Sequence, residues 1–581
     1  MQPTPPNDPA VPDGLTRVDA AVEGAGAPTP APAARRGRKA VVIAVASVVG
    51  LAGIAAASSF AALRGSSETL MAKLPADADL VATAYLDPAA SQKVNLFRLT
   101  SSFPSLGDES QVTGRAGAWV DSVLAGAGLT HDDLGWVGSQ VAVAVDVRSL
   151  GLPSVALMLD TRDEGAAQIG LAALRGGPMF RGVRWTQEDH GGVEAWVGSA
   201  GFQRVCMGIV DGTVVIANGT RAFDDVVATA KGDAPALADD QDFVDTMAGL
   251  PDARLGMIYV APSDLLDVVD RMGGARVARF GTAAGADLDA VRGIGVAISA
   301  EPDAIAIDTE MTVDPSKLTP EQLDAMSAED HDNALLRMVP ADALGFAGLQ
   351  HLGSGLDAAL TDLPADQRAA LERTGVGSAI SSLTGDLAAE VSMPQGSSVP
   401  SGAVMLGTDD GSAMADALQL AAAAVSPASM FGSATATIEG DHSTQAVERS
   451  SSPRWKTVDH DGVTVSYLSG AAGGMGVAPA YAVFDGIGLI ASSKEEAFRV
   501  IDAAHGAPNA MDAERVASAL SAVPDSEGLV YADLAAIVQA VGGSAVMDPE
   551  IQGDLDALQT LVAGSQNDPQ HQHARLVLRI G

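Results

Sequence analysis

The stretch Arg184-Trp-Thr-Gln-Glu-Asp-His-Gly-Gly-Val193 returns later in the chain as Arg454-Trp-Lys-Thr-Val-Asp-His-Asp-Gly-Val463. Sequences around it recur as well, since Leu74-Pro-Ala-Asp77 is matched by Val339-Pro-Ala-Asp342. Matched stretches that keep one order along a chain indicate internal repetition. The sequence therefore predicts two copies of one domain in tandem.

Both copies contain short apolar runs that end at Gly, Pro or Asp-Gly turns, which is typical of strands. Segments with helical spacing of apolar residues separate some of these runs. Strands in series with interspersed helices predict an α+β fold with a largely antiparallel sheet. The expected elements include strands at 154–160 and 304–313 and helices at 220–230, 494–503 and 511–522.

We divide the chain into five parts. Residues 1–39 are predicted to be a disordered tail and residues 40–63 a transmembrane helix. Exterior repeats span 64–318 and 335–581, and a linker joins them at 319–334. The tail is rich in Pro and Ala, and it cannot bury enough apolar surface to offset the entropy of ordering it.

The predicted membrane segment, residues 40–63, contains no charged residue. A helix of this length can cross a hydrocarbon core of about 30 Å. Arg35, Arg36, Arg38 and Lys39 directly precede it. Because positive charge favours the cytoplasmic side, we expect a cytoplasmic N-terminus and an extracytoplasmic body. The sequence thus predicts a single-pass signal-anchor in the cell membrane.

Two export signals are alternatives to an uncleaved anchor. Ala55-Ala-Ala57 could serve as the cleavage site of a signal peptide, and Arg35-Arg36 could belong to a twin-arginine signal. The stretch before the apolar run is long for a signal peptide, and the residues after the arginine pair fit a twin-arginine signal poorly. These features favour the signal-anchor.

Composition limits the classes of function. The chain has 581 residues, of which 47% are hydrophobic but only 4% aromatic, so its cores must use mainly small aliphatic side chains. The net charge is −38, and an acidic body is repelled by phosphate backbones, which excludes nucleic acid as an expected partner. The single cysteine, Cys206, lies in an apolar run and is expected to be a buried hydrophobe.

The sequence lacks the motifs of common catalytic and cofactor sites, including G-x-S-x-G, H-E-x-x-H and the P-loop. Gly293-Ile-Gly295 lies within an expected strand, which argues against a dinucleotide fingerprint. The glycines of 470–476 are expected at a hairpin tip. We predict no catalytic, cofactor-binding or metal-ligating residue.

Two clusters resemble metal sites only weakly. His571-Gln-His573 is the one close histidine pair, and it lacks carboxylates at ligand spacing. The acidic stretch 239–245 lacks the glycine and closing glutamate of a calcium loop, so an acidic helix N-terminus explains it better.

The repeated Asp-His pairs, Asp189/His190 and Asp459/His460, could serve acid–base chemistry in an enzyme. In both copies, however, a glycine and then a strand follow the histidine within a few residues. That pattern is typical of a turn. We therefore interpret both pairs as structural and keep the enzymatic reading as an alternative.

The start of the first copy resembles a known family. Leu74-Pro-Ala-Asp77, Tyr85-Leu-Asp-Pro88, Gln92-Lys93 and Phe103-Pro104 are similar to the opening of a domain-of-unknown-function family of membrane-anchored actinobacterial-type proteins. The resemblance implies a single anchor and a long exterior body. It implies no activity, substrate or site residue.

From these features we expect a non-enzymatic binding or scaffold body in the cell envelope. Its partners would be the membrane, through residues 40–63, and an envelope protein or component. One alternative is a carrier of a lipid or other apolar ligand, because the abundant aliphatic residues could line a cavity. An enzyme with an unrecognised site is the other alternative.

Overall fold

The computed structural model describes most of the chain after the predicted anchor. The described residues are 69–104, 134–147, 153–200, 203–262, 290–327, 331–351, 376–394, 397, 399–424, 454–469, 478–524, 528–542 and 549–581. Contacts divide the chain into Met1–Val48 and Val49–Gly581, and every described residue belongs to the second unit.

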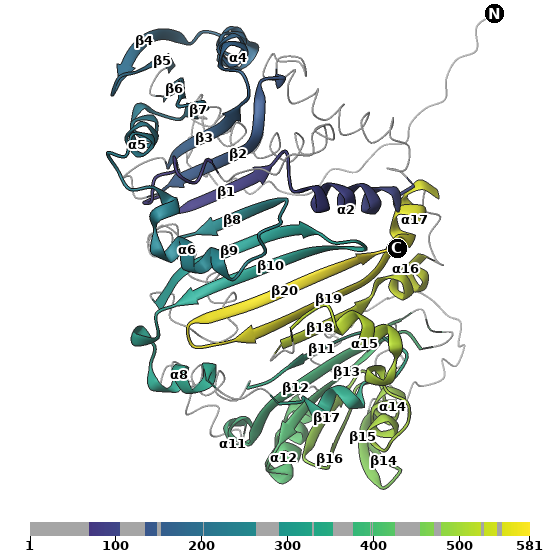
Figure 1. Cartoon of the computed structure of the whole chain (residues 1–581). Coiled ribbons are helices and arrows are strands. Elements are labelled where there is room, and N and C mark those ends of the chain that lie inside the picture. The colour runs from purple at the N-terminus through teal and green to yellow at the C-terminus, as the bar shows by residue number, and fades with distance from the viewer. Residues whose placement is uncertain are drawn as a thin grey trace, which may run out of the picture. The chain divides into compact units, whose positions relative to one another are not determined.

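A single mixed sheet-and-helix body contains a 20-stranded antiparallel sheet (Figure 1). The first ten strands are β1 (Leu80–Tyr85), β2 (Val137–Asp146), β3 (Ser154–Thr161), β4 (Arg184–His190), β5 (Val193–Ala200), β6 (Gln203–Val210), β7 (Thr213–Ala217), β8 (Gly256–Val260), β9 (Val291–Ala300) and β10 (Ala304–Val313). The other ten are β11 (Ala343–Leu349), β12 (Leu383–Ser392), β13 (Ser401–Thr408), β14 (Arg454–His460), β15 (Val463–Ser469), β16 (Ala480–Phe484), β17 (Ile487–Ala491), β18 (Gly528–Asp533), β19 (Leu558–Asn567) and β20 (His571–Ile580).

The order of the strands is the same in each set of ten. Hydrogen bonding gives β4-β5-β6-β7-β3-β2-β1-β8-β9-β10 for the first set. It gives β14-β15-β16-β17-β13-β12-β11-β18-β19-β20 for the second. Strands β10 and β20 pair with each other, so the two sets, hereafter the first and second halves, share one sheet. The predicted antiparallel α+β class is confirmed.

Helices lie against both faces of the sheet. The longer ones are α2 (Ala90–Ser101), α4 (Glu164–Gly176), α5 (Thr220–Ala230), α6 (Gln241–Ala248), α12 (Gly411–Ala424), α14 (Lys494–Ala504), α15 (Glu514–Leu520), α16 (Leu534–Gly542) and α17 (Pro549–Asp556). Cys206 packs in the cluster that contains Phe223 of α5, whereas the next residue, Met207, packs with Leu171 of α4. Because neighbouring residues of a strand face opposite ways, α5 and α4 cover opposite faces.

The largest core crosses the junction between the halves. Ala304 and Ala306 of β10 belong to the cluster that includes Val465, Leu489 and Val562 of the second half. All five are almost completely buried. Small side chains on β10 thus let the core of the second half continue past its last strand.

Most of the expected elements are present with small shifts at their ends. Strand β10 and helix α5 span the predicted residues, whereas the helix expected at 511–522 is shorter. Asn509 accepts a hydrogen bond from Met511 N and starts the short 3₁₀ helix η8 (Ala510–Asp512), so α15 begins only at Glu514.

The region that we predicted as the linker 319–334 contains α8 (Pro320–Met326), which Thr319 and Gln322 begin with a capping box. The predicted tail and anchor lie outside the described residues. Within those residues, no helix is long and apolar enough to span a membrane.

Candidate ligand-binding cavity

The repeated Asp-His pairs lie at the tips of two hairpins, β4–β5 and β14–β15. Asp189 Oδ1 accepts a hydrogen bond of 3.0 Å from Gly192 N, which closes the first turn. Gly191 and Gly192 have φ values of +62° and +86°, as a two-residue type I′ turn requires. Asp461 and Gly462 repeat this backbone in the second half. The predicted turn geometry is confirmed.

The two histidines fasten these hairpins to the neighbouring helices. His190 Nδ1 lies 2.7 Å from Asp224 Oδ1 on α5, and its Nε2 is buried with no hydrogen-bond partner among the described residues. His460 Nε2 lies 2.7 Å from Asp502 Oδ1 on α14, and its ring stacks on Phe498. These contacts give both histidines a role in packing.

The acidic and histidine-rich stretches also make local contacts. Asp240 Oδ1 accepts from Phe243 N and caps α6, while Asp242 and Asp245 pair with Arg292. Across the described residues, no three His, Cys, Asp or Glu side chains are placed to hold a metal ion.

The close pair on β20 lies beside a carboxylate of β10. His571 Nδ1 is 2.9 Å from Glu310 Oε1, and His573 Nδ1 is 3.3 Å from Glu310 Oε2. Asp308 and Arg575, two residues further along the same strands, form an ion pair of 2.9 Å. This polar cluster therefore lies at the junction of the halves.

Gly293 and Gly295, which resembled the start of a dinucleotide fingerprint, have packing roles in the structure. A Cβ on Gly293 would lie 2.4 Å from Thr246 Oγ1, and one on Gly295 would lie 2.8 Å from Leu250. These glycines let α6 and the residues after it lie directly on β9. The glycines of 470–476 lie outside the described residues.

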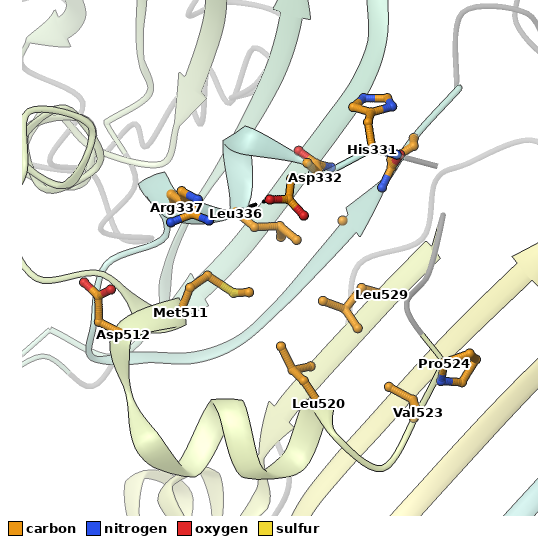
Figure 2. A pocket seen from close by; sticks show the side chains of 13 residues that line it. His331, Asp332, Leu336, Arg337, Met511, Asp512, Leu520, Val523, Pro524 and Leu529 are labelled. Atoms are coloured by element: carbon orange, nitrogen blue, oxygen red, sulfur yellow. Dashed lines mark hydrogen bonds and ion pairs between the residues drawn. The ribbon is translucent and has the colours of Figure 1, made fainter. Parts of the chain in front are cut away.

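A cavity of about 460 Å³ opens in the second half, between the 3₁₀ helix η7 (Ala334–Met338), helix α15 and the sheet. Figure 2 shows the side chains of Leu336, Met511 and Leu529 directed toward one shared space. The lining residues are His331, Asp332, Asn333, Leu336, Arg337, Gly348, Gln350, Met511, Asp512, Leu520, Val523, Pro524 and Leu529.

One wall of the cavity is built by η7 on strand β11. Asn333 begins η7 by accepting from Leu335 N, and its Nδ2 donates to Leu349 O and Leu387 O. Leu336 then lies over Gly348, where a Cβ would come within 2.9 Å of it. The asparagine and the glycine together hold this apolar wall against the sheet.

The opposite wall follows η8 and α15. Val523 and Pro524, after the end of α15, lie against Gly564 of β19, where a Cβ would meet both at about 3.0 to 3.1 Å. Leu520 of α15 and Leu529 of β18 complete the apolar surface. Two glycines on different strands therefore make room for the two walls.

Charged and polar groups surround the opening. His331 Nε2 lies 2.9 Å from Asp386 Oδ1, and Arg337 lies 3.8 Å from the exposed Asp332. Asp512 accepts a hydrogen bond from Asn509 Nδ2. The rim thus carries both signs of charge beside an apolar interior.

Sequence reasoning did not find this cavity. It placed His331 and Asp332 in the linker 319–334 and predicted no binding residue. The walls come together through the pairing of β11 with β18, which joins residues about 180 positions apart in the chain. Only Asn333, as a helix-capping type before an apolar run, offered a local signal.

A second cavity, of about 520 Å³, lies in the first half between α4 and strands β5 and β6. Its side chains engage one another: Arg175 lies over the ring of Trp196 at 4.4 Å, and Gln187 donates to Glu194 at 2.8 Å. The first cavity has more apolar residues in its lining and is the stronger candidate.

The residues that suggested a family resemblance hold the first half together. Lys93 pairs with Asp87, and Gln92 Oε1 accepts a hydrogen bond of 2.7 Å from Ala300 N. Asn95 donates to Ala300 O at 2.8 Å. The contacts of Gln92 and Asn95 tie α2 to the end of β9. These residues therefore have a structural role that requires no ligand.

A family model described as "Protein of unknown function (DUF3352)" matches residues 40–389. The chain belongs to this family, which confirms the predicted membership of a domain-of-unknown-function family. No curated protein matches the chain.

Three crystal forms of TP0453 (IV, III and I) are similar at 11%, 9% and 11% sequence identity. The alignments cover 42%, 45% and 44% of this chain and 79%, 88% and 83% of those chains, with TM-scores of 0.22, 0.23 and 0.22. At TM-scores this low, the similarity supports no conclusion about fold or function.

Proposed function

We propose that this member of the DUF3352 family is a non-enzymatic binding protein of the cell envelope. Residues 40–63 would anchor it as a single-pass protein, and its extracytoplasmic body would bind an amphipathic group of an envelope component in the cavity between η7 and α15. The anchor and the location rest on the apolar segment and on the basic residues that precede it.

The cavity carries the proposal of binding. Its volume of about 460 Å³ falls within the range of small-molecule sites, about 300 to 1,000 Å³. Leu336, Met511 and Leu529 would hold an apolar part of the ligand. Arg337 and Gln350 at the rim would meet its polar or charged end. A ligand with only one kind of surface would leave half of the lining unmatched.

A lipid carrier remains the second candidate. Such a carrier would need a long apolar channel, whereas the described cores are filled by side chains such as Val465, Leu489 and Val562, which have no exposed surface. The mixed lining of the cavity favours a smaller amphipathic group. The bound mass in the experiment below separates the two.

We also infer that the two halves are copies of one domain. Their strand orders agree, and Asp211 and Asp485 both have positive φ at matching Asp-Gly turns. Isolated bridges join Pro75 to Ala236 and Pro340 to Asn509 at matched positions. The copies would differ in function, because the described cavities of the two halves lie at different places and have different linings.

Native mass spectrometry of the full chain, extracted gently from its own host's membrane, tests the function. We expect a co-purifying mass on the unmodified protein. Leu529→Trp should displace it by filling the cavity, and Arg337→Glu should weaken its retention by reversing a rim charge. Leu420→Trp is the matched control, because Leu420 is 48% exposed on α12 and lies away from the cavity.

A bare mass for the unmodified chain would contradict the proposal, as would a ligand that both cavity variants retain. Thermal unfolding of each variant would show whether a lost ligand reflects lost folding. A lipid as the bound mass would support the carrier function instead.

A further inference from the structure

Two glutamates are buried side by side in the second half. Glu390 lies on β12 and is 3% exposed, and Glu496 lies in the first turn of α14 and is 1% exposed. Carboxylates are rarely buried to this extent unless cations or hydrogen-bond donors compensate them. The partners of this pair therefore decide its protonation.

The donors are too few for two ionised carboxylates. Glu496 Oε2 accepts from Ser392 Oγ and from Arg499 Nη1, each at 3.0 Å. Glu496 Oε1 and both oxygens of Glu390 have no donor among the described residues. The one cation, Arg499, is also paired with Asp342.

Among the residues that the structure describes, the other neighbours bring no compensating charge. Phe346 of β11 and Ala403 of β13 flank Glu390 across the strands. Helix η7, which packs on α14 and β12, buries Leu335 and leaves its charged residue, Arg337, largely exposed at the cavity rim. Three carboxyl groups, counting Asp342, thus face a single guanidinium.

Glu390 lies two residues before Ser392 on the same face of β12, and Ser392 donates to Glu496, so the two buried carboxyl groups are neighbours that one shared hydrogen bond could join. Two ionised carboxylates cannot form that bond, because neither has a hydrogen to donate. One proton between them supplies the donor and removes the repulsion of two like charges in a buried site.

We propose that the second half binds one proton between Glu390 and Glu496, and that loss of this proton in alkaline solution loosens α14 from the sheet. The first half provides an internal comparison. There, alanines occupy the two positions that match the glutamates. Ala144 pairs with Val81 as Glu390 pairs with Phe346. Ala222 is the third residue of α5, as Glu496 is of α14. The proton site is therefore specific to the second half.

The direction of the pH effect follows from the pKa. Burial, and next the charge of Glu496, raise the pKa of Glu390 to about 9 from its ordinary value of 4.5. The folded protein thus holds the proton more tightly than the unfolded chain. The stability from this group is complete below pH 4.5 and is lost as the pH rises through about 9.

Chemical denaturation of the full chain over this pH range, with Glu390→Gln, tests the site. The amide keeps the shape and the donor of a protonated carboxyl but cannot ionise. As the pH rises from 4.5 to about 9, the folded-to-unfolded ratio of the unmodified chain should fall by up to about tenfold per pH unit. This fall is in addition to any that Glu390→Gln also shows. Glu495→Gln is the matched control, because Glu495 neighbours Glu496 on α14 but its side chain is 70% exposed.

Infrared spectroscopy gives a second readout that does not depend on unfolding. A protonated carboxyl band should be present at neutral pH in the unmodified chain and in Glu495→Gln, and should be absent in Glu390→Gln. The proposal is overturned if the unmodified chain lacks the band, or if Glu390→Gln keeps the full pH dependence.

Discussion

Cys206 has no exposed surface, and Met158, Phe223 and other apolar side chains share its cluster. Burial, and next the nearby charge of Asp224, raise the pKa of its thiol to about 12. The reactive thiolate is therefore scarce at neutral pH. The prediction from the sequence, a buried small hydrophobe, is confirmed.

We expect Cys206 to resist a thiol reagent such as iodoacetamide in the native full chain and to react readily in denaturant. Intact-mass measurement over time checks this expectation. Rapid modification of the native protein would mean that this part of the first half opens easily.

Individual residues could be interpreted from sequence where their contacts are local. Asp189 and Gly192 are three positions apart, so their turn was visible in the sequence. Glu390 and Glu496 are separated by more than a hundred residues, and only the fold brings them together. Nothing in the local sequence distinguished Glu390 from an exposed strand glutamate.

Substituting two glycines of the first half tests the β4–β5 hairpin and the end of α4. Gly192 closes the β4–β5 hairpin at φ +86°, whereas Gly176 ends α4 with open space around its missing Cβ. Gly192→Ala should destabilise the protein by about 1 kcal/mol or more, because alanine is strained at positive φ. Gly176→Ala should be neutral or stabilising by up to about 1 kcal/mol.

Denaturant unfolding of the two variants beside the unmodified chain measures both effects. Equal stability of the two variants would contradict the assigned turn. Both variants replace glycine by alanine, and the two sites differ in the backbone φ at which the replacement is made.

The elements themselves were largely predictable from sequence, because their patterns are short. Helix α5 follows from apolar residues at helical spacing. Strand β10 follows from its β-branched and apolar residues, bounded by Pro302-Asp303 and Asp314-Pro315. The start of α15 was not predictable, since Asn509 diverts the chain into η8 first.

In the whole molecule, the polar cluster on β10 and β20 makes the stability of the junction between the halves depend on pH. The hydrogen bond that His573 donates to Glu310 is the main cause that raises the pKa of His573 above 6.5. This stabilisation is complete below pH 6.5 and is lost as the pH rises through the higher folded-state value. We expect His573→Gln to flatten the pH dependence of stability just above pH 6.5.

Denaturation of His573→Gln and of Glu390→Gln over the same pH range separates the two groups, because Glu390 already acts between pH 4.5 and 6.5, where His573 does not. A His573→Gln profile that is unchanged near neutral pH would show that the junction does not titrate there.

The shared sheet itself can be tested with paired cysteines. Thr309 and Ala574 are direct partners across β10 and β20, so Thr309→Cys with Ala574→Cys should form a disulfide on mild oxidation. Thr309→Cys with Leu578→Cys is the control, because four residues of strand separate Leu578 from Ala574 by about 13 Å. Cross-linking of the control alone would contradict the register.

The junction is the feature that sequence could predict least. Repeated motifs indicated two similar halves, but edge pairing of β10 with β20 depends on contacts between strands more than 260 residues apart. The cavity shares this origin, since its walls meet only after the sheet has formed. Local patterns carry no information about such pairings.

A crystal structure of the full chain, purified from its own host's membrane, would show whether the cavity holds a ligand. We expect non-protein density in the cavity of the second half, in contact with Met511 and Leu529 and extending toward Arg337. A cavity occupied by the protein's own side chains, or by ordered water alone, would contradict this expectation.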